Sequence, residues 1–115
     1  MSSNYTTKDS GKRQQFDSGG QRDTQEGKPR FDLLFPKGVP YEEQLVTRWA
    51  NLMERGAKKY DERNWELFNS EEELDRAKSS ALRHLLQWFH DEDDEDHAAA
   101  VMFNLLVVEN IKRKL

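Results

Sequence analysis

From residue 41 onward, apolar side chains recur at spacings of three and four, which is the pattern of one face of an α-helix. Three such segments follow one another, at about residues 41–58, 70–90 and 93–113. Ser70 followed by Glu73 fits a capping box at the start of the second segment. The middle of the third, AAAVMFNLLVV, is apolar almost all round, as expected of a helix buried between others. The pattern predicts a small all-α bundle of three main helices, with a polar loop, GAKKYDERNW, at residues 56–65.

The first forty residues lack this periodicity. Residues 1–27 are rich in small and polar residues and are predicted to be a flexible tail, or else a remnant of expression or virion processing without a role. All three prolines fall in residues 28–40, which predicts an extended arm because proline fixes φ and lacks an amide donor. The arm's strongly apolar residues, expected to cross the helical body or reach a neighbouring subunit, are Phe31, Leu33, Leu34 and Phe35. The predicted single domain therefore spans residues 28–115, with its helical body at 41–115.

Composition narrows the possible classes of protein. The chain has 115 residues, enough for one small domain, and no cysteine, which excludes disulfides and thiolate metal sites. Its apolar stretches are too short to span a bilayer and no signal peptide is visible, so we expect a cytoplasmic protein without a membrane partner. Residues 41–115 hold eleven Lys/Arg against seventeen Asp/Glu. This acidic balance argues against nucleic acid as the main partner and leaves room for a metal ion.

Six consecutive carboxylates, Asp91–Asp96, separate the second and third predicted helices. Those at the start of the third helix can cap free amides and meet the positive end of the helix dipole, at about 0.3–1 kcal/mol each. Asp91 and Glu92 fall instead at the negative end of the preceding helix, where acid is unfavourable, and neighbouring carboxylates repel one another. The run is therefore either a solvated surface tip or the site of a divalent cation that relieves the repulsion.

A cation held by this run would be Mg²⁺ or Mn²⁺, because these ions prefer carboxylate oxygens. On the third predicted helix, one face carries Asp93, Asp96, His97, Ala100 and Asn104. Glu54, the only acid in the interior of the first helix, is a candidate to complete the shell. The predicted metal ligands are Glu54, Glu92, Asp93 and Asp96. The predicted catalytic residues are Glu54, Glu92, Asp96 and His97.

Basic, aromatic and histidine residues near the run are candidates for binding phosphate and a base. Lysine and arginine bind phosphate oxygens, and their alternative role is ion pairing with the acidic run. The candidates of this kind are Lys58, Lys59, Arg63 and Arg83. Tyr60 and Trp65 are suited to stacking on a base, or else to core packing. His84 and His97 are candidate hydrogen-bond partners or general bases, whereas His90 lies off the shared face and is assigned no role.

Several segments of the chain carry a resemblance to a known family. They are GKPRFDLL at 27–34, GAKKYDERNWE at 56–66, ALRHLLQWFHDEDDEDH at 81–97, and Asn104 within an apolar helix. Over residues 27 to about 109 the chain resembles a phage and prophage family of dATP/dGTP diphosphohydrolases, N-terminal type. The matching positions are Lys28, Arg30, Asp32, Lys58, Tyr60, Asn64, Trp65, Arg83, His84, Trp88, Glu92, Asp93, His97 and Asn104. Asp91 departs from the usual glycine, and Phe35 interrupts the usual leucine-proline step.

The resemblance implies an all-helical hydrolase related to MazG-type pyrophosphohydrolases. These enzymes cut a nucleoside triphosphate to monophosphate and pyrophosphate, with Mg²⁺ held by acidic helices. For this chain it implies a purine deoxynucleoside triphosphate, dATP or dGTP, with Mg²⁺ or Mn²⁺ as cofactor. The expected substrate-binding residues are Lys58, Tyr60, Asn64, Trp65, Arg83, His84 and Asn104. The Glu-x-x-Glu and Glu-x-x-Asp pairs of MazG-type enzymes are incomplete here, because Glu54 stands alone.

Three functions are compatible with these observations. The first is hydrolysis that reshapes the deoxynucleotide pool, in the host cytoplasm if a phage encodes the chain. The second is a non-catalytic protein that sequesters a nucleotide or a nucleotide-derived signal, which the incomplete carboxylate pairing favours. The third is an interaction protein that uses the tail and the arm. Three helices and an apolar arm are a thin basis for an independent core, so we also expect a homo-oligomer.

Overall fold

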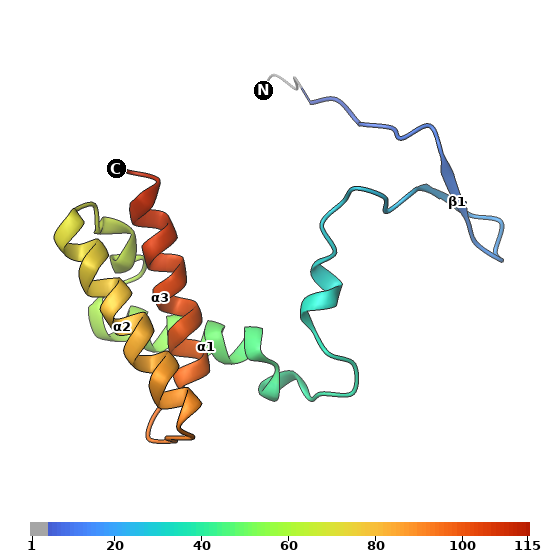
Figure 1. Ribbon diagram of the computed structural model, residues 1–115. Coiled ribbons are helices and arrows are strands. Elements are labelled where there is room, and N and C mark those ends of the chain that lie inside the picture. The colour runs from blue at the N-terminus through green and yellow to red at the C-terminus, as the bar shows by residue number, and fades with distance from the viewer. Residues whose placement is uncertain (1–4) are drawn as a thin grey trace. The chain divides into compact units, whose positions relative to one another are not determined.

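The computed structural model describes residues 5–115, which fall into two compact units, one ending at Phe31 and the other running from Asp32 to Leu115. The second unit carries three helices, α1 (Leu45–Tyr60), α2 (Glu71–Phe89) and α3 (His97–Lys112) (Figure 1). Short 3-10 helices lie at Phe31–Leu34, Tyr41–Glu43 and Asn64–Leu67. This mostly helical structure with three main helices confirms the predicted fold class.

The packing of the helical unit centres on α3. Helices α2 and α3 run antiparallel and lie side by side, and α1 packs against α3 (Figure 1). The hydrophobic core consists of Leu74, Ala77, Val107, Val108 and Ile111. Trp65, Phe68 and Phe103 pack against this core and are partly buried. The nearly continuous apolar sequence of α3 is explained by this position, because a helix with neighbours on two sides buries a wide face.

The helix boundaries follow from the residues at their ends. Ser70 caps α2 in a capping box with Glu73, as predicted. The third helix begins at His97, later than the predicted start near residue 93, because the Asp96 side chain accepts a hydrogen bond from the backbone N–H of Ala99 and so acts as the N-cap. Most of the acidic run therefore lies in the connection between α2 and α3.

The first helix and the loop after it also differ from the prediction. Residues Tyr41–Glu43 form a 3-10 turn, and α1 continues beyond Gly56 to Tyr60. Gly56 is tolerated inside the helix at a cost of about 1 kcal/mol relative to alanine. The C-cap residue is Asp61, whose φ of 116° ends the helix after Tyr60. The predicted polar loop is thus shorter, and part of it forms the 3-10 helix Asn64–Leu67.

The first unit contains a small β-hairpin within the residues predicted to be a flexible tail. Strand β1 (Arg13–Gln15) pairs antiparallel with β2 (Gln21–Asp23), with Gln14 opposite Arg22. The connecting turn is closed by two backbone hydrogen bonds, from the Phe16 N–H to the Gly20 carbonyl at 3.0 Å and from the Gly19 N–H to the Phe16 carbonyl at 2.9 Å. Both strands are largely exposed and polar, so the sequence shows no alternation of apolar and polar residues that would indicate them.

The apolar residues of the arm are not buried within this chain. Leu33 is 71% exposed, and Phe31, Leu34 and Phe35 are exposed as well. The arm is held at its far end by Gln44, whose buried side-chain amide donates to the carbonyl oxygens of Pro36 at 3.1 Å and Val39 at 2.9 Å. The expected burial across the helical body is therefore not found, and contact with a neighbouring subunit stays a prediction.

None of the helices in residues 5–115 is both long enough and apolar enough to cross a membrane.

Candidate functional site

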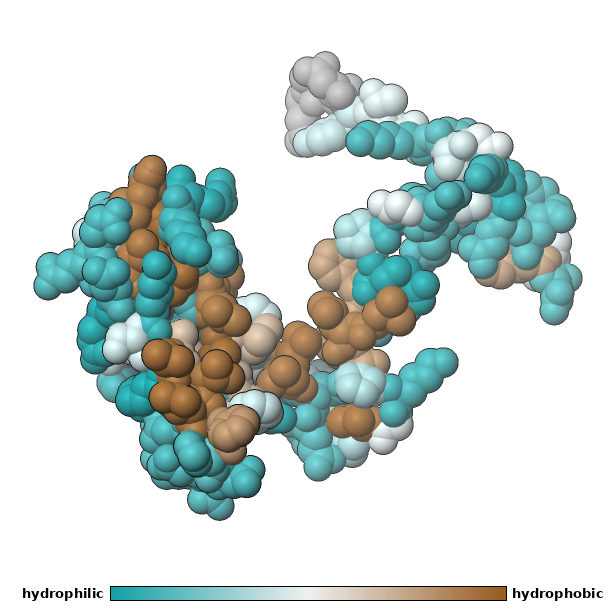
Figure 2. Space-filling view, in the orientation of Figure 1, coloured by the Kyte–Doolittle hydropathy of each residue, from teal (hydrophilic) through white to brown (hydrophobic). Residues whose placement is uncertain are grey.

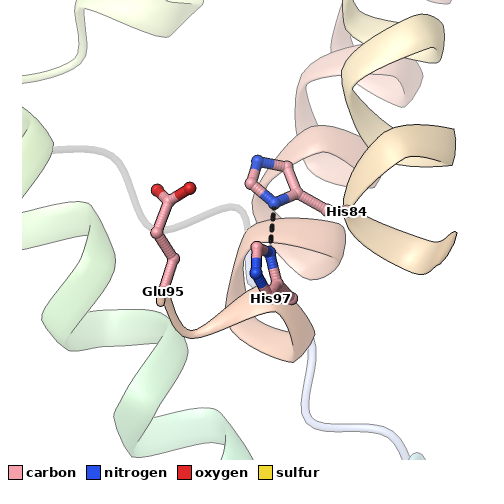
Figure 3. Close-up of side chains that lie close together, drawn as sticks. All are labelled: His84, Glu95 and His97. Carbon is pink, nitrogen blue, oxygen red and sulfur yellow. Dashed lines mark hydrogen bonds between the residues drawn. The ribbon is translucent and has the colours of Figure 1, made fainter. Parts of the chain in front are cut away.

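Two buried histidines meet where α2 passes the start of α3. His84 lies on α2, and His97 is the first residue of α3. Their Nδ1 atoms are 2.8 Å apart, and the side chain of His97 is only 1% exposed (Figure 3). At the two ends of the pair, Arg83 Nη2 lies 3.2 Å from His84 Nε2, and Asp94 Oδ1 lies 2.7 Å from His97 Nε2. All four ring nitrogens therefore have hydrogen-bond partners, as buried polar groups require.

The direction of these hydrogen bonds follows from Arg83, because a guanidinium group can only donate. His84 therefore accepts at Nε2 and carries its proton on Nδ1, which donates to Nδ1 of His97. His97 then carries its proton on Nε2 and donates it to the Asp94 carboxylate. In this assignment both rings are neutral, and the chain of hydrogen bonds runs in one direction from Arg83 to Asp94.

The surroundings of the pair favour a neutral His84 and a charged Asp94. Burial lowers the pKa of His84, the positive charge of Arg83 lowers it further, and the nearby Glu95 carboxylate opposes both effects. The hydrogen bond from His97 lowers the pKa of Asp94 below its ordinary value. His84 is thus held neutral and Asp94 is held charged around neutral pH.

Glu95 brings a carboxylate to the same place from the exposed connection before α3 (Figure 3). Ligand atoms from His84, Glu95 and His97 all lie within 4.8 Å of one another. Among residues 5–115, these three form the one group of histidine and acidic side chains close enough together to hold a metal ion. The donors are imidazole nitrogen and carboxylate oxygen, a combination that many first-row divalent metals accept.

Asp96, predicted to be a catalytic residue and a metal ligand, has structural partners in this fold. Its two carboxylate oxygens accept hydrogen bonds from Arg48 Nε and Nη2, each at 2.9 Å. The bond from Arg48 is the main reason that the pKa of Asp96 lies below its ordinary value. Because Asp96 also caps α3, it links α1 to the start of α3.

The four predicted metal ligands do not gather in the described part of the chain. Glu54 forms an exposed ion pair with Lys58 at 3.1 Å, one turn along α1. Asp96 is paired with Arg48, and Glu92 and Asp93 lie in the exposed connection between α2 and α3. The assembled group instead contains Glu95, which the sequence analysis did not select.

The remaining predicted substrate-binding residues are spread over the helical unit. Tyr60 is exposed at the end of α1, with Lys59 Nζ 5.0 Å from the centre of its ring. Asn64 and Trp65 lie on the 3-10 helix after α1, where Trp65 packs against the core. Asn104 is buried, and its side-chain amide donates to the Ala100 carbonyl at 2.8 Å. Their role in substrate binding stays a prediction.

A shallow, open groove of about 330 Å³ lies along the outer side of α2. Its lining residues are Ser79, Leu82, Arg83, Leu86, Gln87, His90 and Glu92. Arg83 Nη1 donates to Gln87 Oε1 at 2.8 Å, and the Gln87 amide donates to Glu92 at 3.4 Å. Arg83 therefore connects the groove to the buried histidine pair, because its other terminal nitrogen contacts His84.

Sequence reasoning missed three side chains of this region. Asp94 contacts His97 three positions later, a spacing at which side chains near a helix start can meet. Glu95 was one acid among six, and nothing in its spacing distinguished it from its neighbours. Arg48 pairs with a residue 48 positions away, which no local pattern can indicate.

Comparison with known proteins identifies a family for this chain. No curated protein and no solved structure matches the chain. A family model described as dATP/dGTP diphosphohydrolase, N-terminal, matches residues 18–114. The matched part contains strand β2, the arm, all three helices and the histidine pair. Since the match covers most of the sequence, this chain belongs to the dATP/dGTP diphosphohydrolase N-terminal family.

Proposed function

We propose that this chain hydrolyses dATP or dGTP to the monophosphate and pyrophosphate, with Mg²⁺ or Mn²⁺ accompanying the triphosphate. The observation that carries the proposal is the family match over residues 18–114. A nucleotide ligand follows from the family's name, while the choice of bond and of base is our own inference. The reaction would lower the concentration of purine deoxynucleoside triphosphates in the cell.

Arg83 is the residue that we place at the phosphates. It borders the groove and is held there by Gln87, so its guanidinium can turn to a bound anion without crossing the protein interior. A planar guanidinium fork matches two phosphate oxygens at once. Leu82 and Leu86 offer an apolar wall for the nucleoside part. The other predicted substrate contacts remain Lys58, Tyr60, Asn64, Trp65, His84 and Asn104.

Glu92 is the carboxylate that we place at the attacking water. It lines the groove and is exposed, whereas His97 is buried with both ring nitrogens hydrogen-bonded. In the proposed step the water oxygen forms a bond to the α-phosphorus. The bond from the α-phosphorus to the α–β bridging oxygen breaks, and that oxygen leaves with the pyrophosphate. Glu92 takes the proton that the water loses.

The described residues do not present an assembled oxygen site for Mg²⁺. Glu54 is paired with Lys58 and Asp96 with Arg48, so half of the predicted ligands have other partners. We therefore assign no step to a protein-bound Mg²⁺. The same observation favours a second candidate function, in which the chain binds a purine nucleotide and releases it unchanged.

We also propose that two copies of the chain associate beside the groove. Leu82, Leu85, Leu86 and Phe89 recur at helical spacing on α2, and each is between 45% and 71% exposed. Figure 2 shows apolar surface over α2 and α3. The core has few large side chains. Among the described residues, the largest side chains that are fully buried are those of Ile111 and Val107. A two-fold pairing through Leu85 and Phe89, which lie outside the groove lining, would leave Leu82 and Leu86 facing the groove and give the open groove a second wall.

The proposed function is tested by incubating the purified chain with each of the four deoxynucleoside triphosphates, with and without Mg²⁺ or Mn²⁺. We expect dATP and dGTP to be consumed in preference to the pyrimidine nucleotides, and Arg83→Met to lower kcat/KM by roughly 100-fold. Arg76→Met is the matched control, because Arg76 is also exposed on α2 and bonds to a residue four positions later, at 3.1 Å. Turnover that both variants retain in full would contradict the role of Arg83. Tight binding with unchanged nucleotide on recovery would select the non-catalytic alternative.

A further inference from the structure

The imidazoles of His84 and His97 and the carboxylate of Glu95 form an assembled set of donors that the proposed hydrolysis does not use. Two of these side chains are buried, and the third lies on an exposed connection. Carboxylate-rich sites suit Mg²⁺, but two imidazole nitrogens suit Zn²⁺, Co²⁺ or Ni²⁺ much better. These ligands therefore suit a different class of metal ion from the Mg²⁺ that the family resemblance implies.

We propose that His84, Glu95 and His97 together bind one borderline divalent ion of the Zn²⁺ or Co²⁺ class. Binding does not depend on whether the chain hydrolyses a nucleotide. Zinc–nitrogen bonds of about 2.0–2.1 Å at tetrahedral angles place two ligand nitrogens roughly 3.3 Å apart. The two Nδ1 atoms are 2.8 Å apart, so the rings would separate by roughly 0.5 Å. Glu95 can close on the ion because its side chain is exposed, and solvent fills the fourth position.

Asp94 prepares His97 for this role. The Nε2–H of His97 donates to the Asp94 carboxylate at 2.7 Å, which leaves the Nδ1 lone pair directed toward His84. A carboxylate behind a ligating histidine fixes the ring tautomer and makes the metal-binding nitrogen more basic. Asp94 is therefore a positioning residue for the ion, and it is not itself a ligand.

Arg83 acts in the opposite sense, because it competes with the ion for His84. If the ion binds Nε2 of His84, it must displace the Arg83 guanidinium, whose Nη2 lies 3.2 Å from that atom. If the ion binds Nδ1, the proton must move to Nε2, where it would face the Arg83 N–H. In both cases Arg83 must turn away, and its positive charge also repels the ion. Removing Arg83 is thus expected to strengthen metal binding, whereas removing the Asp94 charge is expected to weaken it.

The test is a titration of the metal-free chain with Co²⁺ alone, followed by visible absorption, since the band strengthens when Co²⁺ moves from six-coordinate water to a tetrahedral site of nitrogen and oxygen ligands. We expect one bound ion per chain, displaced by one equivalent of Zn²⁺. Glu95→Gln removes one ligand from an exposed position and is expected to weaken binding at least tenfold. Asp91→Asn is the matched control, because it removes the same charge from the same acidic run and is expected to change the Kd by less than twofold.

Two further variants separate a built site from attraction to the acidic run. Asp94→Asn is expected to weaken Co²⁺ binding roughly 10- to 100-fold, and Arg83→Met to strengthen it. The proposal is overturned if the folded wild-type chain binds neither Co²⁺ nor Zn²⁺. It is also overturned if Asp91→Asn weakens binding as much as Glu95→Gln does, or if Arg83→Met weakens it. Circular dichroism of each variant confirms that the helices are intact before the titration is interpreted.

Discussion

At the scale of single residues, the acidic run has members with different roles. Asp96 is held by Arg48 and caps α3, Asp94 accepts from His97, and Glu95 faces the histidine pair. Glu92 faces the groove on α2. The repulsion among six carboxylates is therefore relieved in part by Arg48 and by hydrogen bonds, and a bound cation is not needed to account for every member of the run.

The pairing of Arg48 with Asp96 predicts a stability effect. Arg48→Met removes a bidentate partner from a carboxylate whose side chain is only 24% exposed. We expect a loss of about 1–2 kcal/mol in the free energy of unfolding, at the lower end for a charged hydrogen bond because solvent screens the pair. Urea denaturation measures it. A loss no larger than that of Arg76→Met would show that the pair contributes nothing.

The backbone at Asp91 predicts a second stability effect. Asp91 has φ 58°, which is a left-handed backbone conformation. Aspartate tolerates this conformation better than most residues, but glycine adopts it without strain. We expect Asp91→Gly to raise the free energy of unfolding by about 0.5–1 kcal/mol. Asp93→Gly, at an ordinary φ, is expected to lower it, and equal effects of the two variants would contradict this account.

At the scale of elements, the sequence was sufficient where the signals are local. The helical periodicity predicted three helices, and the Ser70 capping box located the start of α2. The start of α3 was placed too early, because any of several acids could have been the N-cap and only the contact with Arg48 distinguishes Asp96. The hairpin was missed because its strands are polar and exposed. Local pattern therefore predicted the three helices and the start of α2, whereas the start of α3 depends on a tertiary contact.

The capping box of α2 predicts a dependence of stability on pH. Hydrogen bonds from the backbone N–H of Asn69 and from Ser70 lower the pKa of Glu73 below its usual 4.5. A lowered pKa in the folded state means that the charge of Glu73 stabilises the protein above about pH 4.5, and that this contribution is lost as the pH falls through the lowered value. We expect the stability difference between wild type and Glu73→Gln to be smaller at pH 3 than at pH 7. A difference of the same size at both pH values would disprove the argument.

At the scale of the whole molecule, the three-helix unit leaves much apolar surface exposed. The stripe on α2 and the apolar residues of the arm belong to this surface. Sequence periodicity identified which helix faces are apolar. It could not show that α3 would cover only part of the apolar surface of α2 and leave the stripe exposed. In the same way, it suggested the acids and histidines of the site without indicating which of them meet, since Arg83, His84 and His97 come together only when α2 and α3 pack.

The exposed stripe predicts self-association. We expect the wild-type chain to sediment as a dimer at micromolar concentration, and the double variant Leu85→Gln, Phe89→Gln to sediment as a monomer, because both residues lie on the stripe and outside the groove lining. Leu67→Gln is the control, since Leu67 is 73% exposed and lies on the 3-10 helix Asn64–Leu67, which is not part of the stripe. A monomeric wild-type chain at all concentrations would contradict the proposed pairing.

The proposed reaction converts a purine deoxynucleoside triphosphate to its monophosphate and pyrophosphate. The most direct measurement is phosphorus NMR of dATP and of dGTP incubated with the chain and Mg²⁺ or Mn²⁺, because pyrophosphate, triphosphate and orthophosphate give separate signals. We expect equal amounts of deoxynucleoside monophosphate and pyrophosphate as the products. Release of triphosphate or orthophosphate instead, or no turnover of either nucleotide at high protein concentration, would contradict the proposed reaction.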